Sequence, residues 1–203
     1  MAAVWRVGHG QSVMLGAACV LIGVLNVTPD SFSDGGRFNV ADEAIAHAKA
    51  MRAEGAQIID VGGESTRPGA EPVDAATEQA RVLPIIEALR SETDALISID
   101  TYRSETARLA VQEGAHIIND VTGLQGEKDM AKAVADTGSG VIIMHTGRGR
   151  EKLPDVIEDQ YVFLRLSLKI AAEAGISDSG IVLDPGFGFA KETTEENLEL
   201  MAR

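Results

Sequence analysis

Residues 96–120 read LISIDTYRSETARLAVQEGAHIIND and contain one complete unit of the fold. The runs Leu96–Asp100 and His116–Asp120 are short, apolar and rich in isoleucine, which is typical of buried strands in a parallel sheet. Between them, Ser104 can begin a helix that extends to Glu113. A strand, a helix and a second strand in this order predict a βαβ unit with parallel strands.

The same alternation continues in both directions along the chain. Further strands are predicted at Val20–Asn26, Gln57–Val61, Gly140–His145 and Ile181–Asp184. Further helices are predicted at Val40–Glu54, Ala75–Ser91, Glu127–Asp136, Ile157–Ala174 and Thr193–Arg203. Six such units without a linker fit one α/β domain over residues 1–203, built either as a doubly wound sheet or as most of a (β/α)8 barrel. A predicted hairpin, Val4–Val7 with Ser12–Leu15, could plug the bottom of a barrel.

The composition excludes several classes of protein. The chain is 45% hydrophobic and 24% charged, as expected of a globular protein. Its net charge of −13, without a basic run, argues against nucleic acid as a partner. The single cysteine, Cys19, cannot form an internal disulfide, and the apolar run Val13–Val27 is too short to span a membrane. We therefore expect a cytoplasmic protein that acts on small molecules.

A polar residue closes each predicted strand. In chain order these residues are Asn26, Asp60, Asp100, Asn119, His145 and Asp184. In a parallel barrel the carboxyl ends of the strands meet at one mouth, where barrel enzymes carry their active sites. Asp and Asn also favour turns, which would account for any single one of these residues. Their presence at all six strands favours the barrel, with a site at its mouth.

Several long segments, in the same order, resemble the signatures of dihydropteroate synthases. They are Gly23–Gly36 (GVLNVTPDSFSDGG), Ile59–Gly69 (IDVGGESTRPG), Ile99–Thr101, Ile118–Val121, Met144-His145 and Leu183–Phe189 (LDPGFGF). A chance match to long ordered segments is improbable. The resemblance implies a TIM (β/α)8 barrel. It also implies a transferase of folate biosynthesis that condenses 6-hydroxymethyl-7,8-dihydropterin pyrophosphate with p-aminobenzoate, giving 7,8-dihydropteroate and pyrophosphate.

The resemblance implies a pterin pocket made of four residues. Asp184 is assigned to the 2-amino/N3 edge, because a carboxylate can accept two parallel hydrogen bonds from it. Asp100 and Asn119 are assigned to other ring nitrogens, and Met144 to the pocket wall. The alternatives are a helix-capping role for Asp100 and core packing for Met144.

The resemblance also implies a Mg²⁺ cofactor and two loops that close over the substrates. Asn26 resembles the family's Mg²⁺ ligand, and substrate phosphates and water would complete its shell; a simple turn is the alternative. Asp34, Thr66 and Arg67 carry over as catalytic loop residues, with Arg67 near pyrophosphate. Thr66 and Pro68 would shape the p-aminobenzoate site, while Phe189 could stack on its ring.

The chain departs from the family around its fifth strand. It has Met144-His-Thr-Gly-Arg-Gly149 where the family more often has Met-His-Met, so His145 is treated as structural and is not assigned to catalysis. Two rival functions remain open, a pterin-dependent methyltransferase domain and an inactive pterin-binding homologue. The two loop signatures argue against the methyltransferase, since methyl transfer needs no pyrophosphate or p-aminobenzoate site.

The six predicted units also suggest an incomplete barrel. The chain reaches Arg203 in the helix after the sixth strand, and the family's later Lys-x-Arg and Arg-x-His segments have no match. We expect such a truncated chain to have little or no activity alone, because a barrel closes with eight strands. The complete protein is expected to be a homodimer and a target of sulfonamides, which mimic p-aminobenzoate.

Overall fold

The parallel sheet predicted from the alternating pattern is the centre of the structure. The computed structural model describes residues 3–16, 18–28, 37–65, 71–189, 191 and 193–203. The strands of the sheet are β3 (Ile22–Asn26), β4 (Ile58–Gly62), β5 (Leu96–Asp100), β6 (Ile117–Asp120), β7 (Gly140–Met144) and β8 (Ile181–Asp184). They lie in the order β3-β4-β5-β6-β7-β8, and every neighbouring pair is parallel.

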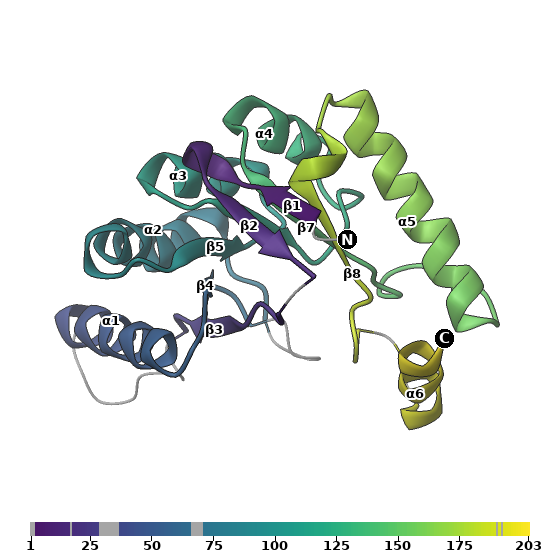
Figure 1. Cartoon of the computed structure of the whole chain (residues 1–203), viewed down its shortest axis with the longest axis horizontal. Helices are drawn as coiled ribbons and strands as arrows, with labels where there is room; N and C mark the ends of the chain where they lie inside the picture. The colour runs from purple at the N-terminus through teal and green to yellow at the C-terminus, as the bar shows by residue number, and fades with distance from the viewer. Residues whose placement is uncertain (1–2, 17, 29–36, 66–70, 190, 192) are drawn as a thin grey trace.

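This strictly sequential order decides between the two architectures that the sequence left open. A doubly wound sheet reverses its strand order at a switch point, whereas a (β/α)8 barrel adds each new strand next to the previous one. The intervening helices are α1 (Arg37–Ala53), α2 (Ala75–Glu92), α3 (Ser104–Glu113), α4 (Met130–Thr137) and α5 (Val156–Glu173), followed by α6 (Thr194–Ala202). Figure 1 shows α1 to α5 in an arc around the sheet. The fold is therefore that of six successive units of a (β/α)8 barrel.

The two faces of the sheet bury different sets of side chains. Successive residues of a strand point to opposite faces. On the outer face, Ile59, Ile97, Ile118 and Ile143 join one large apolar core with residues of the helices. On the inner face, a separate and smaller cluster contains Ile58, Ile117 and Ile142. The near-continuous isoleucine and valine runs of the central strands reflect this burial on both sides, whereas Ile22 and Val24 of β3 and Leu183 of β8 remain exposed at the two edges of the sheet.

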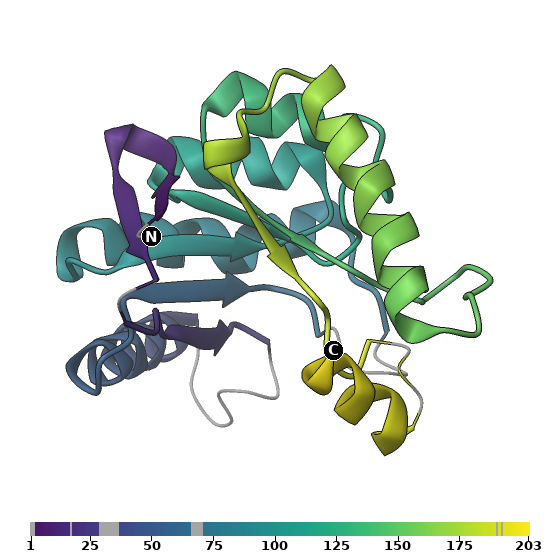
Figure 2. The same ribbon diagram turned by 45° about the vertical axis from the view of Figure 1, so that its right-hand side comes forward.

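The hairpin closes the inner face at the amino ends of the strands. It consists of β1 (Ala3–Arg6) and β2 (Ser12–Leu15), which are antiparallel. Trp5, Val7 and Val13 belong to the inner cluster, and the Trp5 indole N–H donates to the Gly180 carbonyl just before β8, at 3.0 Å. Figure 2 shows the hairpin on the side where the parallel strands begin, with α6 near the end of β8. The prediction that the hairpin plugs the bottom of the barrel is confirmed.

Gly140 allows the hairpin to approach this closely. A β-carbon placed on Gly140 would lie 2.7 Å from Val7 Cγ1 and 3.2 Å from Trp5 Nε1. A larger residue would therefore displace the plug.

Some predicted boundaries are wrong by a few residues. The helix predicted from Glu127 begins at Met130, and the Glu127 carboxylate before it accepts from the first amide of α3, at Ser104. The helix predicted from Thr193 begins at Thr194, because Thr193 is its N-cap and forms a capping box with Glu196. In the part of the chain that the structure describes, no helix has the length and apolar character needed to cross a membrane.

Trp5→Ala is expected to lower the free energy of unfolding by about 3–5 kcal/mol, because it empties the centre of the inner cluster. Trp5→Phe keeps most of the ring and loses only the bond to Gly180, so its loss should be about 1 kcal/mol. Urea unfolding followed by circular dichroism measures both values. A loss below 1 kcal/mol for Trp5→Ala would show that the hairpin does not stabilise the sheet.

Candidate active site

A row of polar side chains lies on the inner face at the carboxyl ends of the strands. Asn26 of β3 is in register with Gly62 of β4, Gly62 with Asp100 of β5, and Asp100 with Asn119 of β6. Residues in register on neighbouring parallel strands point to the same face. The sequence prediction that Asn26, Asp100 and Asn119 share the mouth is therefore confirmed.

Asp184 of β8 lies on the same face, two residues further toward the carboxyl end, because Asn119 is in register with Ile142 and Ile142 with Val182. It is in register with Met144 of β7, whose side chain is almost fully buried. The prediction that Met144 lines a pocket wall and the alternative of core packing are both compatible with this position. The polar side chains thus come from four of the six strands, β3, β5, β6 and β8, while β4 contributes Gly62 and β7 contributes Met144.

Two members of the predicted ring lie elsewhere. Strand β4 continues to Gly62, so Asp60 lies within the strand, with its side chain buried one layer below the row. His145 follows the end of β7 and contacts Asp159 of α5, on the outer side of the sheet. Strand alternation explains both corrections: Asp60 lies two residues before Gly62 and so stays on the inner face but deeper in the barrel, whereas His145 lies one residue after Met144 and so points to the outer face.

Asp60 sets the orientation of the Asn119 amide. The amide nitrogen Nδ2 of Asn119 donates to Asp60 Oδ2 at 3.0 Å. Among the described residues, Asn119 Oδ1 and Asp60 Oδ1 are buried without a hydrogen-bond partner. Buried polar atoms of this kind are rare and costly unless something binds them. The carbonyl oxygen of Asn119 is therefore available to accept a bond from a ligand N–H.

The inner face concentrates negative charge. Burial raises the pKa of Asp60, and burial together with the nearby charge of Asp60 raises the pKa of Asp100 well above its ordinary value. Glu78 and Glu64 add further negative charge around Asp100. Such a site favours a ligand that offers N–H donors or carries positive charge.

The Asp184 carboxylate is held by the loop that follows β8. Asp184 Oδ1 accepts from the Gly186 amide at 2.7 Å, and the Asp184 carbonyl accepts from the His145 amide at 2.9 Å. Gly186 has a positive φ of 64°, and a β-carbon there would lie 2.1 Å from the His145 carbonyl oxygen. Only glycine fits this turn. The bond from Gly186 uses one lone pair of Asp184 Oδ1, so Oδ2 and the other lone pair of Oδ1 can accept from a ligand.

The aromatic end of this loop lies near a cation. The guanidinium of Arg148 lies over the ring of half-buried Phe189, 4.4 Å from the ring centre. An arginine on an aromatic face holds the ring in one orientation. Phe189 is thus a fixed element beside the row, compatible with its predicted stacking role.

Sequence reasoning missed the network that anchors the loop after β4. Glu64 accepts from Arg103 Nη2 at 2.9 Å and from the Tyr102 hydroxyl at 3.0 Å. Arg103 also pairs with Glu78, which is almost fully buried and accepts from Thr101 at 2.9 Å. The sequence signal for it is the glutamate of Gly62-Gly-Glu-Ser65, a charged residue in a segment otherwise made of small residues. This network fixes the base of that loop.

The predicted loop residues Asp34, Thr66, Arg67 and Pro68 lie outside the described residues. Within the described part of the chain, no three His, Cys, Asp or Glu side chains could hold a metal ion together. Asn26 nevertheless faces an open position. A β-carbon on Gly62 would lie 3.5 Å from Asn26 Oδ1 and 3.7 Å from Asp100 Oδ2, so glycine leaves space between these two oxygens. One amide oxygen beside such a space fits a Mg²⁺ ion that takes most of its ligands from phosphate and water.

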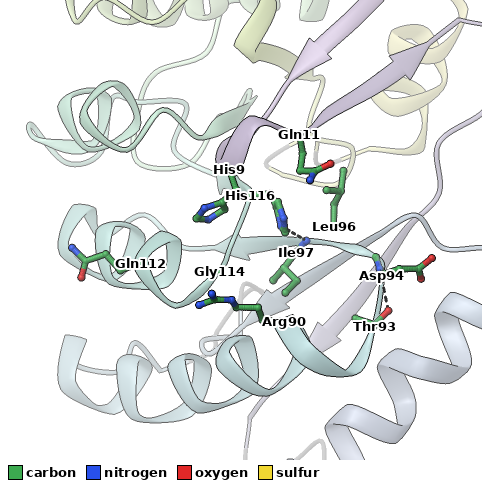
Figure 3. A pocket seen from close by; sticks show the side chains of 11 residues that line it. His9, Gln11, Arg90, Thr93, Asp94, Leu96, Ile97, Gln112, Gly114 and His116 are labelled. Carbon is green, nitrogen blue, oxygen red and sulfur yellow. Dashed lines mark hydrogen bonds between the residues drawn. The ribbon is translucent and has the colours of Figure 1, made fainter.

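A pocket of about 450 Å³ lies at the opposite end of the barrel. It is lined by residues of the hairpin, of the ends of α2 and α3, and of the segments that lead into β5 and β6, including His9, Arg90 and His116 (Figure 3). Burial and the neighbouring His9 lower the pKa of His116 to about 4, so His116 is neutral at pH 7. This pocket is formed at the amino ends of the strands and shares no residue with the polar row.

Comparison with known proteins agrees with this arrangement. A family model described as "Pterin binding enzyme" matches residues 22–203. The dihydropteroate synthase of Clostridium beijerinckii is 47% identical over 187 residues, which are 92% of this chain and 69% of that protein. The dihydropteroate synthase of Bacillus subtilis is 48% identical over 185 residues, which are 90% of this chain and 63% of that protein.

Solved structures give the same result. The dihydropteroate synthase of Clostridium difficile, crystallised in the presence of pteroic acid, superimposes with a TM-score of 0.88 and 46% sequence identity. The match covers 93% of this chain and 71% of that one. The chain thus spans 63% of the Bacillus subtilis protein and 71% of the Clostridium difficile chain.

Asp100→Asn is expected to stabilise the ligand-free protein at pH 7. The pKa of Asp100 in the folded state is raised above the ordinary value of 3.8, so folding becomes less favourable as the pH rises above 3.8 and the carboxyl ionises. Each unit of this rise costs about 1.4 kcal/mol, and a neutral amide avoids the cost. Urea unfolding should show a gain of at least about 1 kcal/mol at pH 7 that shrinks toward pH 4.

Asp136→Asn provides the matched control. Asp136 pairs with Lys132 and Arg108 on the surface, and these bonds lower its pKa. Its amide variant should therefore be slightly less stable at pH 7. A loss of stability for Asp100→Asn as well would contradict the proposed repulsion on the inner face.

Proposed function

The chain belongs to the dihydropteroate synthase family of pterin-binding enzymes, which are transferases, and we propose that the mouth of its barrel joins a dihydropterin pyrophosphate to p-aminobenzoate. The observation that carries the proposal is the row of Asn26, Asp100, Asn119 and Asp184 on one face of the sheet. It presents carboxylate and amide oxygens to a single space.

Pterin recognition follows from the donors and acceptors of the row. A pterin is flat and carries several N–H groups, including the 2-amino group and N3–H on one edge. The Asp184 carboxylate can accept both hydrogens of that edge. Gly186 uses only one of the carboxylate lone pairs, and the others remain for the ligand. The Asn119 carbonyl oxygen, which Asp60 holds in place, can accept another N–H. Asp100 would bond a further ring nitrogen.

The negative charge of the inner face also supports the chemistry. When pyrophosphate leaves, the C–O bond breaks with its electrons and positive charge develops on the pterin methylene group. Asp60, Asp100 and Asp184 would stabilise that charge because they are fixed before the reaction begins. The lone pair of the neutral amine of p-aminobenzoate then forms the C–N bond, and the resulting ammonium loses a proton to water or to the departed pyrophosphate, so no general base is required for attack.

Leaving-group departure is proposed to involve Mg²⁺ at Asn26. A bound Mg²⁺ ion would neutralise charge on the departing phosphate oxygens. Asn26 supplies one oxygen, and Gly62 leaves room beside it. Asp34, Thr66 and Arg67 are proposed to act from the two loops, with Arg67 near the pyrophosphate.

The second substrate is proposed to bind between the loops and the end of β8. Thr66 and Pro68 would shape this site, and Phe189, which is held by Arg148, would stack against the p-aminobenzoate ring. Competition by sulfonamides, assembly into a homodimer and a cytoplasmic location complete the proposal. These three points rest on the family resemblance.

Asp184→Asn is expected to weaken binding of a pterin without phosphates by about 3 kcal/mol or more, because the amide places a donor opposite two ligand donors. The substitution is specific, since the amide oxygen can still accept from Gly186 and preserve the loop. Isothermal calorimetry measures the effect. Asp178→Asn, an exposed change at the amino end of β8, serves as the control and should bind normally. Equal affinity of Asp184→Asn and wild type would remove Asp184 from pterin recognition.

Asn26→Ala, or chelation of Mg²⁺ in the wild type, should slow pyrophosphate release at least tenfold and leave binding of a phosphate-free pterin nearly unchanged, since the ion would contact only the leaving group. Pyrophosphate is measured by a coupled assay and pterin binding by calorimetry. Equal losses in both measurements would instead place Asn26 in the pterin pocket.

A further inference from the structure

Lys191 is a buried lysine that the proposed reaction does not use. Its side chain is only 6% exposed, although an ammonium group is costly to bury. All three of its protons have acceptors: the carbonyls of Pro185 at 2.8 Å and Gly186 at 2.7 Å, and His145 Nδ1 at 2.9 Å. We propose that Lys191 is a positioning residue that holds the Asp184 carboxylate in place for pterin binding, an inference that rests on the proposed function.

The bonds of Lys191 lead directly to Asp184. Lys191 binds the carbonyl of Gly186, and the amide of the same residue donates to Asp184 Oδ1 at 2.7 Å. Pro185, the residue after Asp184, is held by Lys191 and also by Gln160 of α5, at 2.9 Å. The carbonyls of the two residues that follow Asp184 are thereby bound by buried side chains, and the Pro185 carbonyl shares its peptide group with the amide that holds the carboxylate.

The hydrogen bonds of Lys191 also lead, through His145, to Asp159 of α5. His145 Nε2 lies 2.8 Å from Asp159 Oδ2, and the His145 ring packs edge-on against Phe163. Burial, followed by the charge of Lys191, lowers the pKa of His145 to about 4, so the ring is neutral at pH 7. Its Nδ1 accepts from the ammonium, and its Nε2 lies 2.8 Å from both Asp159 Oδ2 and Arg150 Nη2. Arg150 also binds Asp159 and completes the anchor.

Alternative roles for Lys191 fit the geometry less well. A methionine or leucine could fill the same space without the cost of burying a charge, so packing alone does not account for an ammonium here. A direct contact with substrate is not indicated, because its three donors are used by the loop and by His145 on the outer side of the sheet. Burial lowers the pKa of Lys191 to about 8, and the charges of Asp184 and Asp159 oppose this shift. The ammonium form therefore predominates at pH 7.

The far side of the loop is braced in a similar way. Asn197 of α6 accepts from the Gly188 amide at 3.0 Å and donates to the Lys191 carbonyl at 3.2 Å. The side chain of Lys191 and its own backbone are thus both bound within the same loop. Removal of the ammonium should release the turn at Pro185 and Gly186 while α6 remains attached through Asn197.

The experiment compares Lys191→Met, which keeps the aliphatic stem, with wild type. Binding of a phosphate-free pterin should weaken about tenfold or more in the variant. A loss of this size is expected when the Asp184 carboxylate is misoriented and one of its hydrogen bonds to the pterin is lost. Lys169→Met, on the exposed face of α5, is the matched control and should bind as wild type does. Lys191→Arg keeps the charge and donors and should recover part of the affinity.

A double-mutant cycle separates positioning from a general structural role. In an Asp184→Asn background, Lys191→Met should cause little further loss, because the lysine acts through the carboxylate that has already been changed. Additive losses would overturn the proposal, and so would unchanged affinity in Lys191→Met alone. If the methionine variant does not fold, Lys191→Gln is measured in the same way, and the same outcomes apply.

Amide hydrogen exchange tests the inference without any ligand. Exchange at the Gly186 amide should be at least tenfold faster in Lys191→Met than in wild type, while core amides of β5 and β6 exchange equally in both. Unchanged exchange at Gly186 would overturn the positioning role even if pterin binds. A wild-type protein that binds no pterin would instead contradict the proposed function, and the exchange result would still decide the role of Lys191.

Discussion

The alternation of side chains along each parallel strand is the constraint on which the rest of this structure depends. A period of two sends one set of residues outward to the helices and the other inward to the barrel. The outer set is mostly apolar and forms the main core, with Asp120 at the end of β6 as a buried exception. The inner set changes along the strand, from Ile58 and Ile117 near the hairpin to Gly62, Asp100 and Asn119 at the mouth. One strand thus contributes to the core at its start and to the site at its end.

The concentration of carboxylates at the mouth is unfavourable for the ligand-free fold. Asp60 and Asp100 are buried together, and the pKa of each is raised. A protein selected only for stability would place apolar residues or a cation there. The arrangement suits a site that binds a ligand rich in N–H donors and stabilises positive charge on it. Such a ligand supplies hydrogen-bond donors to the carboxylate and amide oxygens. The unpartnered oxygens of Asp60 and Asn119 are consistent with this account.

The loops that follow β4 and β8 at the mouth begin in segments that the structure describes. These segments are held by buried networks of charged side chains instead of apolar packing. Glu64, at the base of the loop after β4, is bound by Arg103, which is shared with Glu78. The loop after β8 is bound by Lys191, with His145 and Asp159 behind it. Directional hydrogen bonds restrict orientation more strictly than apolar contacts do. This difference matters where carboxylates must meet particular atoms of a ligand.

Much of this protein was determined by sequence patterns of short range. The isoleucine-rich runs predicted the strands, and their polar ends predicted that Asn26, Asp100, Asn119 and Asp184 share one mouth. The hairpin around Trp5 was also correctly expected to close the barrel. These features depend on local periodicity and on residues close together in the chain, which a single sequence contains.

Only the tertiary structure decided the features that depend on distant pairs. The sequential strand order excluded the doubly wound sheet, and the register moved Asp60 below the row and turned His145 outward. Lys191 and His145 are 46 residues apart, and Asn119 and Asp60 are 59 apart. No local pattern specifies such pairs, because they form only when the curved sheet brings separate strands and loops together. Burial lowers the local dielectric constant and so strengthens each of these hydrogen bonds, and burial exists only in the folded chain.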